Sequence, residues 1–224
     1  NAGKTTTHFA DTPDQTNDQI NSLALQPDGK ILAGGTSSTT RSTVFAIARF
    51  APDGSMDEGF GHGGRTTTDF GNSYDRANSL VLGPDGTIIA AGYTSATRTT
   101  AFAVARYMAD GRADPAFGTG GKLTTLSGAH SYAIQAALHP DGGLVVAGFT
   151  YGTDHMAFAV ARYALPGAAC DRRREAVPDP RGAGGTQKTP GTSYGCGGDN
   201  RDRMRGPVLP LGKVLGELSP LRGL

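Results

Sequence analysis

The chain is a succession of short apolar runs separated by polar turns. Leu23-Ala24-Leu25 and Ile31-Leu32-Ala33 are two such runs, and the five residues between them read Gln-Pro-Asp-Gly-Lys. Proline presets the backbone at the second position of a turn and glycine accepts a positive φ, so this stretch predicts a β-hairpin. The same arrangement returns over residues 80–92 and again over residues 136–148.

A third apolar run and a threonine-rich fourth run follow the hairpin. The third run is Phe-Ala-Ile-Ala-Arg-Phe at 45–50, with close copies at 102–107 and 158–163. Both faces of this run are apolar apart from the arginine, which favours a strand that is covered on both sides. The fourth run, at 65–70 and 122–126, is rich in threonine and is typical of an exposed edge strand.

These elements recur with spacings of 57 and then 56 residues. A period just above fifty residues is typical of repeat architectures, in which a single unit cannot bury its own apolar face. Four short antiparallel strands per unit predict the blades of a β-propeller. We therefore expect an all-β fold, a partial β-propeller of about three four-stranded antiparallel blades, with units over about residues 20–70, 77–126 and 133–163.

The repeat domain is expected to span residues 1–163. Residues 3–9 match residues 64–70, so we expect them to form strand four of a preceding unit. The third unit has no fourth run of its own in the sequence, and propellers have about four to eight blades. We therefore expect a fragment of a longer protein, with self-association through open blade edges as the alternative.

Three landmarks recur in a fixed order and are specific in combination. They are the hairpin Pro27-Asp28-Gly29-Lys30-Ile31-Leu32, the run Phe102–Tyr107 and the corner Asp114–Gly118. Over about residues 3–163 the chain resembles the delta-60 repeat family of bacterial proteins. The resemblance implies a propeller-like array in secreted or surface-exposed proteins, with no known catalytic residue and no established ligand. The third unit departs from the family pattern, because Gly143 stands in place of lysine and the D-x-x-F-G corner is absent.

The repeat pattern stops after residue 163. Residues 164–224 contain much Gly, Pro and Arg without periodicity, a composition that buries too little apolar surface to offset the entropy of ordering it. We expect this tail to be low in complexity and disordered, or to result from a frameshift, because the pattern is lost suddenly. Both cysteines of the chain, Cys170 and Cys196, lie here and allow either a disulfide or two free thiols.

Composition and charge argue against two kinds of partner, nucleic acid and membrane. The 224 residues carry a formal net charge of +1, and the basic cluster Arg172-Arg173-Arg174 lies between acidic residues without interleaved aromatics, so we expect no nucleic-acid partner. No apolar run approaches the roughly 18 residues of a spanning helix, so we expect no membrane span. Nothing at the N-terminus has the zones of a signal peptide.

Residues that recur with the repeat are the first candidates for a site. Arg49, Arg106 and Arg162 occupy the same position of the third strand, and a ring of guanidinium groups would suit anions. A charge on a covered strand must be paired or solvated, however. We therefore favour a structural role, in which these arginines pair with acids such as Asp57 and Asp114, eight residues further on.

Two other sets recur in the same way. The aspartate of each Pro-Asp-Gly turn is expected to hydrogen-bond the local backbone; these residues are Asp28, Asp85 and Asp141. A glycine ends the second apolar run of each unit and is expected where sheets approach closely; these residues are Gly35, Gly92 and Gly148.

No pattern predicts catalysis. The histidines fall at different phases of the repeat and no G-x-S-x-G elbow frames a serine, so we predict no catalytic, metal-binding or cofactor-binding residue and no cofactor. We expect a non-catalytic extracellular structural or interaction module, secreted or on the cell surface as the family resemblance implies. The alternative is a propeller-type hydrolase or lyase with its site at the mouth of the central channel. The contact surface is predicted on the loops between strands two and three, which would fit a protein or carbohydrate ligand: residues 36–43, 94–100 and 150–156.

Overall fold

The structure, a computed structural model, describes residues 3–9, 17–38, 42–71, 74–96, 99–125, 130–151 and 155–166. All regular secondary structure in these ranges is β-strand, which confirms the prediction of an all-β fold. The predicted disordered tail lies outside the described residues from residue 167 onward, and so do both cysteines. The strands are β1 (Asn17–Leu25), β2 (Ile31–Ser38), β3 (Thr43–Phe50), β4 (Arg65–Thr68), β5 (Tyr74–Leu82), β6 (Ile88–Ala96), β7 (Thr99–Tyr107), β8 (Lys122–Thr125), β9 (His130–Leu138), β10 (Leu144–Tyr151) and β11 (Met156–Tyr163).

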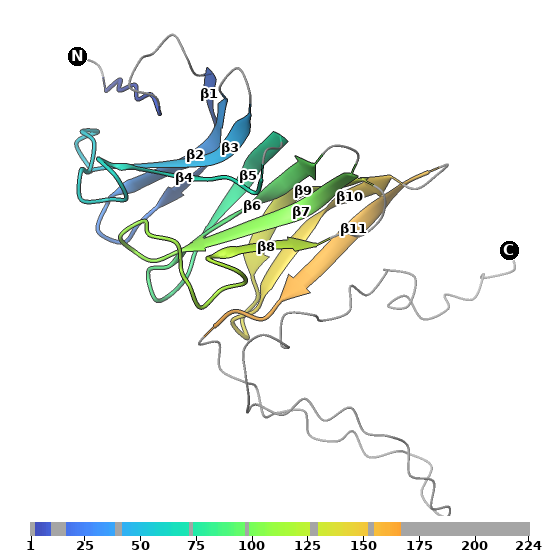
Figure 1. The fold of residues 1–224 in the computed structure, drawn as a ribbon. Coiled ribbons are helices and arrows are strands. Elements are labelled where there is room, and N and C mark those ends of the chain that lie inside the picture. The colour runs from blue at the N-terminus through green and yellow to red at the C-terminus, as the bar shows by residue number, and fades with distance from the viewer. Residues whose placement is uncertain are drawn as a thin grey trace, which may run out of the picture.

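The strands fall into three consecutive units that lie side by side (Figure 1). The first unit comprises β1 to β4, the second β5 to β8 and the third β9 to β11, and neighbouring strands within a unit are antiparallel. One parallel residue pair joins each unit to the next, Thr43 with Tyr74 and Thr100 with His130. The third unit shows three strands in the part of the chain that the structure describes.

A buried aspartate turns the chain from one unit into the next. The carboxylate of Asp75, at the start of β5, accepts a hydrogen bond from the Phe70 N–H at 2.7 Å. Because this N–H is directed to a side chain and not to β3, β4 ends at Thr68, two residues before the predicted end of the fourth run. The Asp18 carboxylate accepts from the Phe9 N–H in the same way, at 3.2 Å.

Residues 3–9 lie over the first unit but do not form the expected strand. Phe9 is held by Asp18 as Phe70 is held by Asp75, so the segment takes the place that β4 takes relative to the second unit. It has no strand hydrogen bonds because the described residues include no third strand of a preceding unit beside it. Phe9 packs against a small apolar cluster formed by Ala33, Ala48 and Phe50.

The core lies between the units. Strand β5 packs against β1, β2 and β3, and β9 packs against β5, β6 and β7. Phe45 and Ile47 of β3 are therefore buried together with Leu80 of the second unit. Phe102 of β7 is buried in the same way with Leu144 of the third unit. Each unit thus buries its apolar face by contact with its neighbour, as the repeat pattern predicts.

Side chains at a β-bulge also connect the first strands of successive units. The bulges in β1 and β5 place Asn21 and Asn78 as the extra residues. Asn21 donates from Nδ2 to the carbonyl of Ala77 at 2.8 Å, and Asn78 donates to the carbonyl of Ala133 at 2.7 Å. The serine that follows each asparagine accepts a backbone N–H of the next unit. The third unit has Ile134 at the bulge, so it lacks this connection.

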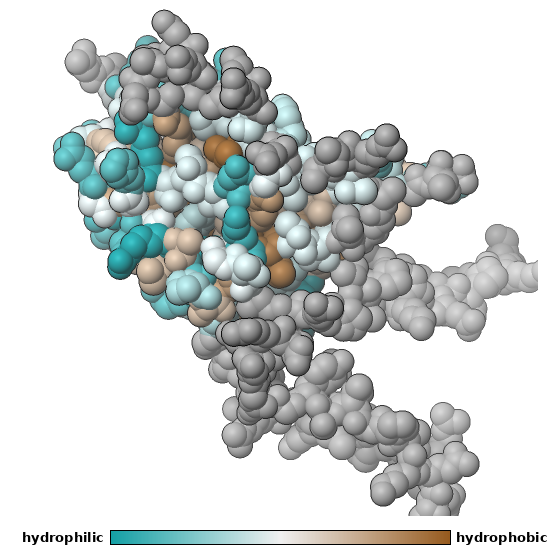
Figure 2. Space-filling view, in the orientation of Figure 1, coloured by the Kyte–Doolittle hydropathy of each residue, from teal (hydrophilic) through white to brown (hydrophobic). Residues whose placement is uncertain are grey.

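The two outer faces of the array expose apolar side chains that are buried elsewhere. Leu23 on β1 is 64% exposed, whereas Leu80, its counterpart in the second unit, is 8% exposed. Phe158 on β11 is 85% exposed, whereas its counterpart Phe102 is fully buried. In the orientation of Figure 2 the described surface is mostly polar or neutral, with a few apolar side chains between. The neighbouring unit accordingly decides which copies of a repeated residue are buried.

The phenylalanines at positions 102 and 158 test this dependence on the neighbouring unit. We expect Phe102→Ala to lower the free energy of unfolding by about 3–5 kcal/mol, because it leaves a cavity between the second and third units. Phe158→Ala should change it by about 0.5 kcal/mol or less, because little contact is lost. Urea unfolding followed by circular dichroism measures both. Equal losses would show that β11 is covered in solution.

Candidate functional site

Arg49 is buried in the junction between the first two units. Its Nε donates to the Asp57 carboxylate at 2.7 Å, and its Nη1 donates to the carbonyl of Ala109, in the second unit, at 2.5 Å. The guanidinium also lies 4.6 Å from the ring centroid of Phe60. Burial raises the pKa of Asp57, but hydrogen bonding from Lys30 and the charge of Arg49 outweigh this effect and leave the pKa below its ordinary value. One arginine thus joins its own unit to the next.

Arg106 makes the equivalent contacts one repeat later. Its Nη1 lies 3.2 Å from the Asp114 carboxylate, and its Nη2 donates to Asp85 at 3.1 Å. Nη1 also donates to the carbonyl of Pro166, in the third unit, at 3.3 Å. Because Arg49 and Arg106 are buried and paired with carboxylates, they do not present an anion-binding ring to solvent.

Arg162 occupies the same repeat position at the outer face of the third unit. Its side chain is 58% exposed, whereas that of Arg106 is 5% exposed. Its Nη2 is paired with the Asp141 carboxylate. The environment of this third arginine therefore differs because no described unit lies beyond it.

The turn aspartates bond to the backbone two residues ahead. Asp28 accepts from the Lys30 N–H at 3.2 Å, and Asp85 accepts from both the N–H and the hydroxyl of Thr87. Asp141 accepts from the Gly143 N–H at 3.0 Å. This backbone bond, followed by the bond from Arg162, lowers the pKa of Asp141 to about 2. The pairs with Arg106 and Arg162 also connect two of these turns to the third strand of their unit.

The repeated glycines lie opposite the bulges of the first strands. A Cβ atom would approach a carbonyl oxygen of the neighbouring strand within 1.8 Å at Gly35 and Gly92, and within 1.9 Å at Gly148. The close approach is therefore between strands of one unit, and not between sheets as expected from the sequence. The contact between sheets lies at Gly34, where a Cβ atom would come within 2.6 Å of Leu80.

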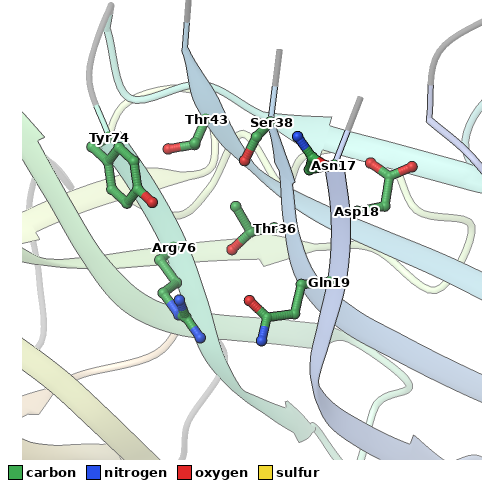
Figure 3. A pocket seen from close by; sticks show the side chains of 8 residues that line it. All are labelled: Asn17, Asp18, Gln19, Thr36, Ser38, Thr43, Tyr74 and Arg76. Atoms are coloured by element: carbon green, nitrogen blue, oxygen red, sulfur yellow. The ribbon is translucent and has the colours of Figure 1, made fainter. Parts of the chain in front are cut away.

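A polar hollow of about 400 Å³ lies at the junction of the first two units (Figure 3). Thr36 and Gln19 project into it from the first unit, and Tyr74 and Arg76 face them from β5. Asp18 points away from the centre of the hollow. The remaining lining residues are Asn17, Ser38 and Thr43.

The hollow lies where β2 ends and β3 begins. Ser38 ends β2 and Thr43 begins β3, so both belong to the predicted contact loop 36–43, and residues 36–38 and 43 of that loop are strand residues instead. Residues 39–41, 97–98 and 152–154 of the three predicted loops lie outside the described residues. The candidate site therefore includes the described ends of one predicted loop, together with β1 and β5.

The equivalent position at the second junction is filled by aromatic rings. The repeat places Tyr93 at the position of Thr36 and Tyr132 at the position of Arg76. The rings of these two tyrosines lie 4.9 Å apart between centroids, and Tyr132 stacks on Phe149 at 5.1 Å. The first junction is hollow because the small side chain of Thr36 and the long polar side chain of Arg76 stand where the second junction has two tyrosine rings.

Two polar groups in the hollow are available to a ligand. The hydroxyl oxygen of Thr36 is buried and has no hydrogen-bond partner among the described residues. Arg76 donates from Nη2 to Asn21 at 3.1 Å and from Nε to Asn78 at 3.2 Å. Its Nη1 has no partner in the described part of the chain. Tyr74 and Arg76 were not predicted as site residues from the sequence, although both lie at positions where the units differ, which was the available signal.

The described residues lack two further kinds of functional element. They contain no cluster of three or more His, Cys, Asp or Glu side chains that could hold a metal ion. They also contain no helix with the length and apolar character needed to cross a membrane.

Replacing the arginines measures what each junction contributes. We expect Arg106→Gln to lower the free energy of unfolding by about 3 kcal/mol, because Asp114 then stays buried without its cation. Arg162→Gln should cost about 1 kcal/mol or less, because that pair is exposed to solvent. Chemical unfolding of both variants is the measurement. A larger loss for Arg162→Gln would contradict the role assigned to the junctions.

Acid should destabilise the fold. Five aspartates have pKa values below the ordinary carboxyl value in the folded chain, namely Asp53, Asp57, Asp85, Asp110 and Asp141. The unfolded chain then binds more protons than the folded chain below about pH 4, so stability falls as pH falls. We expect the urea midpoint to stay level from about pH 7 to 5 and to drop between about pH 4 and 2. A midpoint that stays level to about pH 2 would contradict this prediction.

Comparison with known families is consistent with the repeat. Residues 26–60 and 83–117 match the model of a family described as a domain of unknown function (DUF5122) beta-propeller. Each matched segment runs from the hairpin turn through the second and third strands of its unit to the phenylalanine of the Phe-Gly corner. No curated protein matches the chain. Fold and family match together indicate a β-propeller repeat domain.

Proposed function

We propose that the chain is a non-catalytic interaction module that binds its ligand at the end of the array carrying the connections between second and third strands. The observation that carries the proposal is the polar hollow where β2 ends and β3 begins, with the hydroxyl of Thr36, which has no partner among the described residues, inside it. Ligand sites are usually concave and orient their ligand through a small number of precisely placed polar groups.

The distribution of repeated and varied residues supports this division of roles. Arg49 and Arg106 recur and are engaged in holding units together. The hollow is lined at positions where the units differ, such as Thr36 and Arg76. Repeat proteins commonly keep recognition on varied positions of a fixed scaffold.

An extracellular or cell-surface location forms part of the proposal and is supported by the resemblance to the delta-60 repeats. The exposed apolar faces at Leu23 and Phe158 support a second element, that the three units belong to a longer array or associate with other copies. Either arrangement would cover side chains that are buried at the internal junctions.

Binding to a printed glycan array tests the proposed function. The chain is compared with one variant at the hollow and one at the opposite end of the strands. We expect the chain to bind a subset of glycans and Tyr74→Ala to weaken that binding about tenfold, because an exposed ring at the hollow is lost. His62→Ala removes an exposed ring from the β3–β4 connection, at the opposite end, and should leave binding unchanged.

Two results would contradict the proposal, and a third would change the class of its ligand. Equal losses in both variants would place binding elsewhere. Release of shortened glycans during incubation would favour the hydrolase or lyase alternative. If no glycan on the array binds but a purified protein binds and Tyr74→Ala weakens that binding, the chain is still an interaction module. Its ligand is then a protein and not a carbohydrate.

A further inference from the structure

We infer that the polar hollow binds an acidic sugar, with Arg76 facing the carboxylate and Thr36 hydrogen-bonded to a ring hydroxyl. This inference rests on the proposed function and specifies its ligand class. It concerns the first junction alone, where Thr36 and Arg76 replace the tyrosine pair of the second junction.

The hydroxyl of Thr36 requires a partner. The residue is 7% exposed, and its oxygen accepts and donates no hydrogen bond among the described residues. A buried hydroxyl without a partner costs free energy. A ligand hydroxyl that enters the hollow can both donate to this oxygen and accept from it, which removes that cost.

Arg76 supplies a cation whose position is fixed. Asn21 and Asn78 accept from two of its nitrogens, so the guanidinium is held in place before a ligand arrives. Nη1 remains without a partner in the described residues. A guanidinium held in this way favours a carboxylate, because the bond is charge-assisted and little side-chain freedom is lost on binding.

The rest of the lining favours a sugar over an acidic peptide. Gln19 and Asn17 carry amide groups that both donate and accept, and Ser38 adds a hydroxyl. Such a lining matches a ligand with several hydroxyl groups around a compact ring. The Tyr74 ring is 55% exposed at the edge of the hollow and offers a flat apolar surface for one face of that ring. The volume of about 400 Å³ lies within the range of small-molecule sites.

A matched pair of sugars tests the carboxylate requirement. Methyl β-glucuronide and methyl β-glucoside differ at one carbon, which is a carboxylate in the first and a hydroxymethyl group in the second. We expect the glucuronide to bind the full chain about tenfold more tightly at low salt, with backbone amide NMR shifts at Gln19, Thr36 and Arg76. Binding should weaken at about 0.5 M salt, where charges are screened.

A variant that fills the hollow locates the binding. Thr36→Tyr introduces the residue that the second junction carries at Tyr93, so the fold already accommodates it at an equivalent place. We expect this variant to lose glucuronide binding by about tenfold or more while keeping its urea midpoint. Thr67→Tyr places the same side chain on the exposed strand β4 and serves as the matched control.

Each other outcome overturns a defined part of the inference. Equal binding of both glycosides with shifts at the hollow would remove the acidic class and leave the proposed function intact. Equal binding of N-acetylglutamate methylamide would show that a carboxylate alone is recognised and would overturn the assignment to a sugar. Absence of shifts with all three probes, when the glycan array is positive, would place the proposed binding outside the hollow. Absence of binding in both experiments would overturn the proposed function as well.

Discussion

Burial of the apolar strands of one unit against the next is the interaction on which this structure depends. A single unit of four short strands leaves both faces of its third strand in water, and the repeated phenylalanine shows the consequence. Phe102 is fully buried because β9 and β10 cover it, whereas Phe158 has the same neighbours in sequence and is 85% exposed. The hydrophobic contribution therefore belongs to the junctions between units, and each further junction adds to it.

Polar side chains make these junctions specific. Apolar contact alone would allow one sheet to slide over another, since hydrophobic burial is not directional. Arg49 and Arg106 reach a backbone carbonyl of the next unit while they stay paired within their own. Asn21 and Asn78 do so from the middle of the first strands. These directional bonds fix the position of each unit on the next, which in turn fixes the shape of the hollow between β1 and β5.

The two junctions between units have equivalent positions, and the candidate site lies where the residues at two of these positions differ. Tyr93 and Tyr132 close the second junction with an edge-to-face ring contact, and Thr36 and Arg76 leave the first one open. The same arginine is held by two asparagines whose main role is structural. A recognition site formed in this way needs no separate scaffold, because the contacts that join the units also orient its cation.

The sequence by itself determined most of the strands and the period, and it favoured a pairing of Arg49 with Asp57, because alternation, turn residues and spacing are local signals. Only the tertiary structure decided the rest. It showed that Gly35 is required by a bulge within its unit, that Asn21 and Asn78 join units, and that Thr36 and Arg76 face one hollow. Residues about forty positions apart, such as Thr36 and Arg76, meet only after two sheets have packed, and no local pattern encodes that contact. The sequence could mark them only as departures from the repeat.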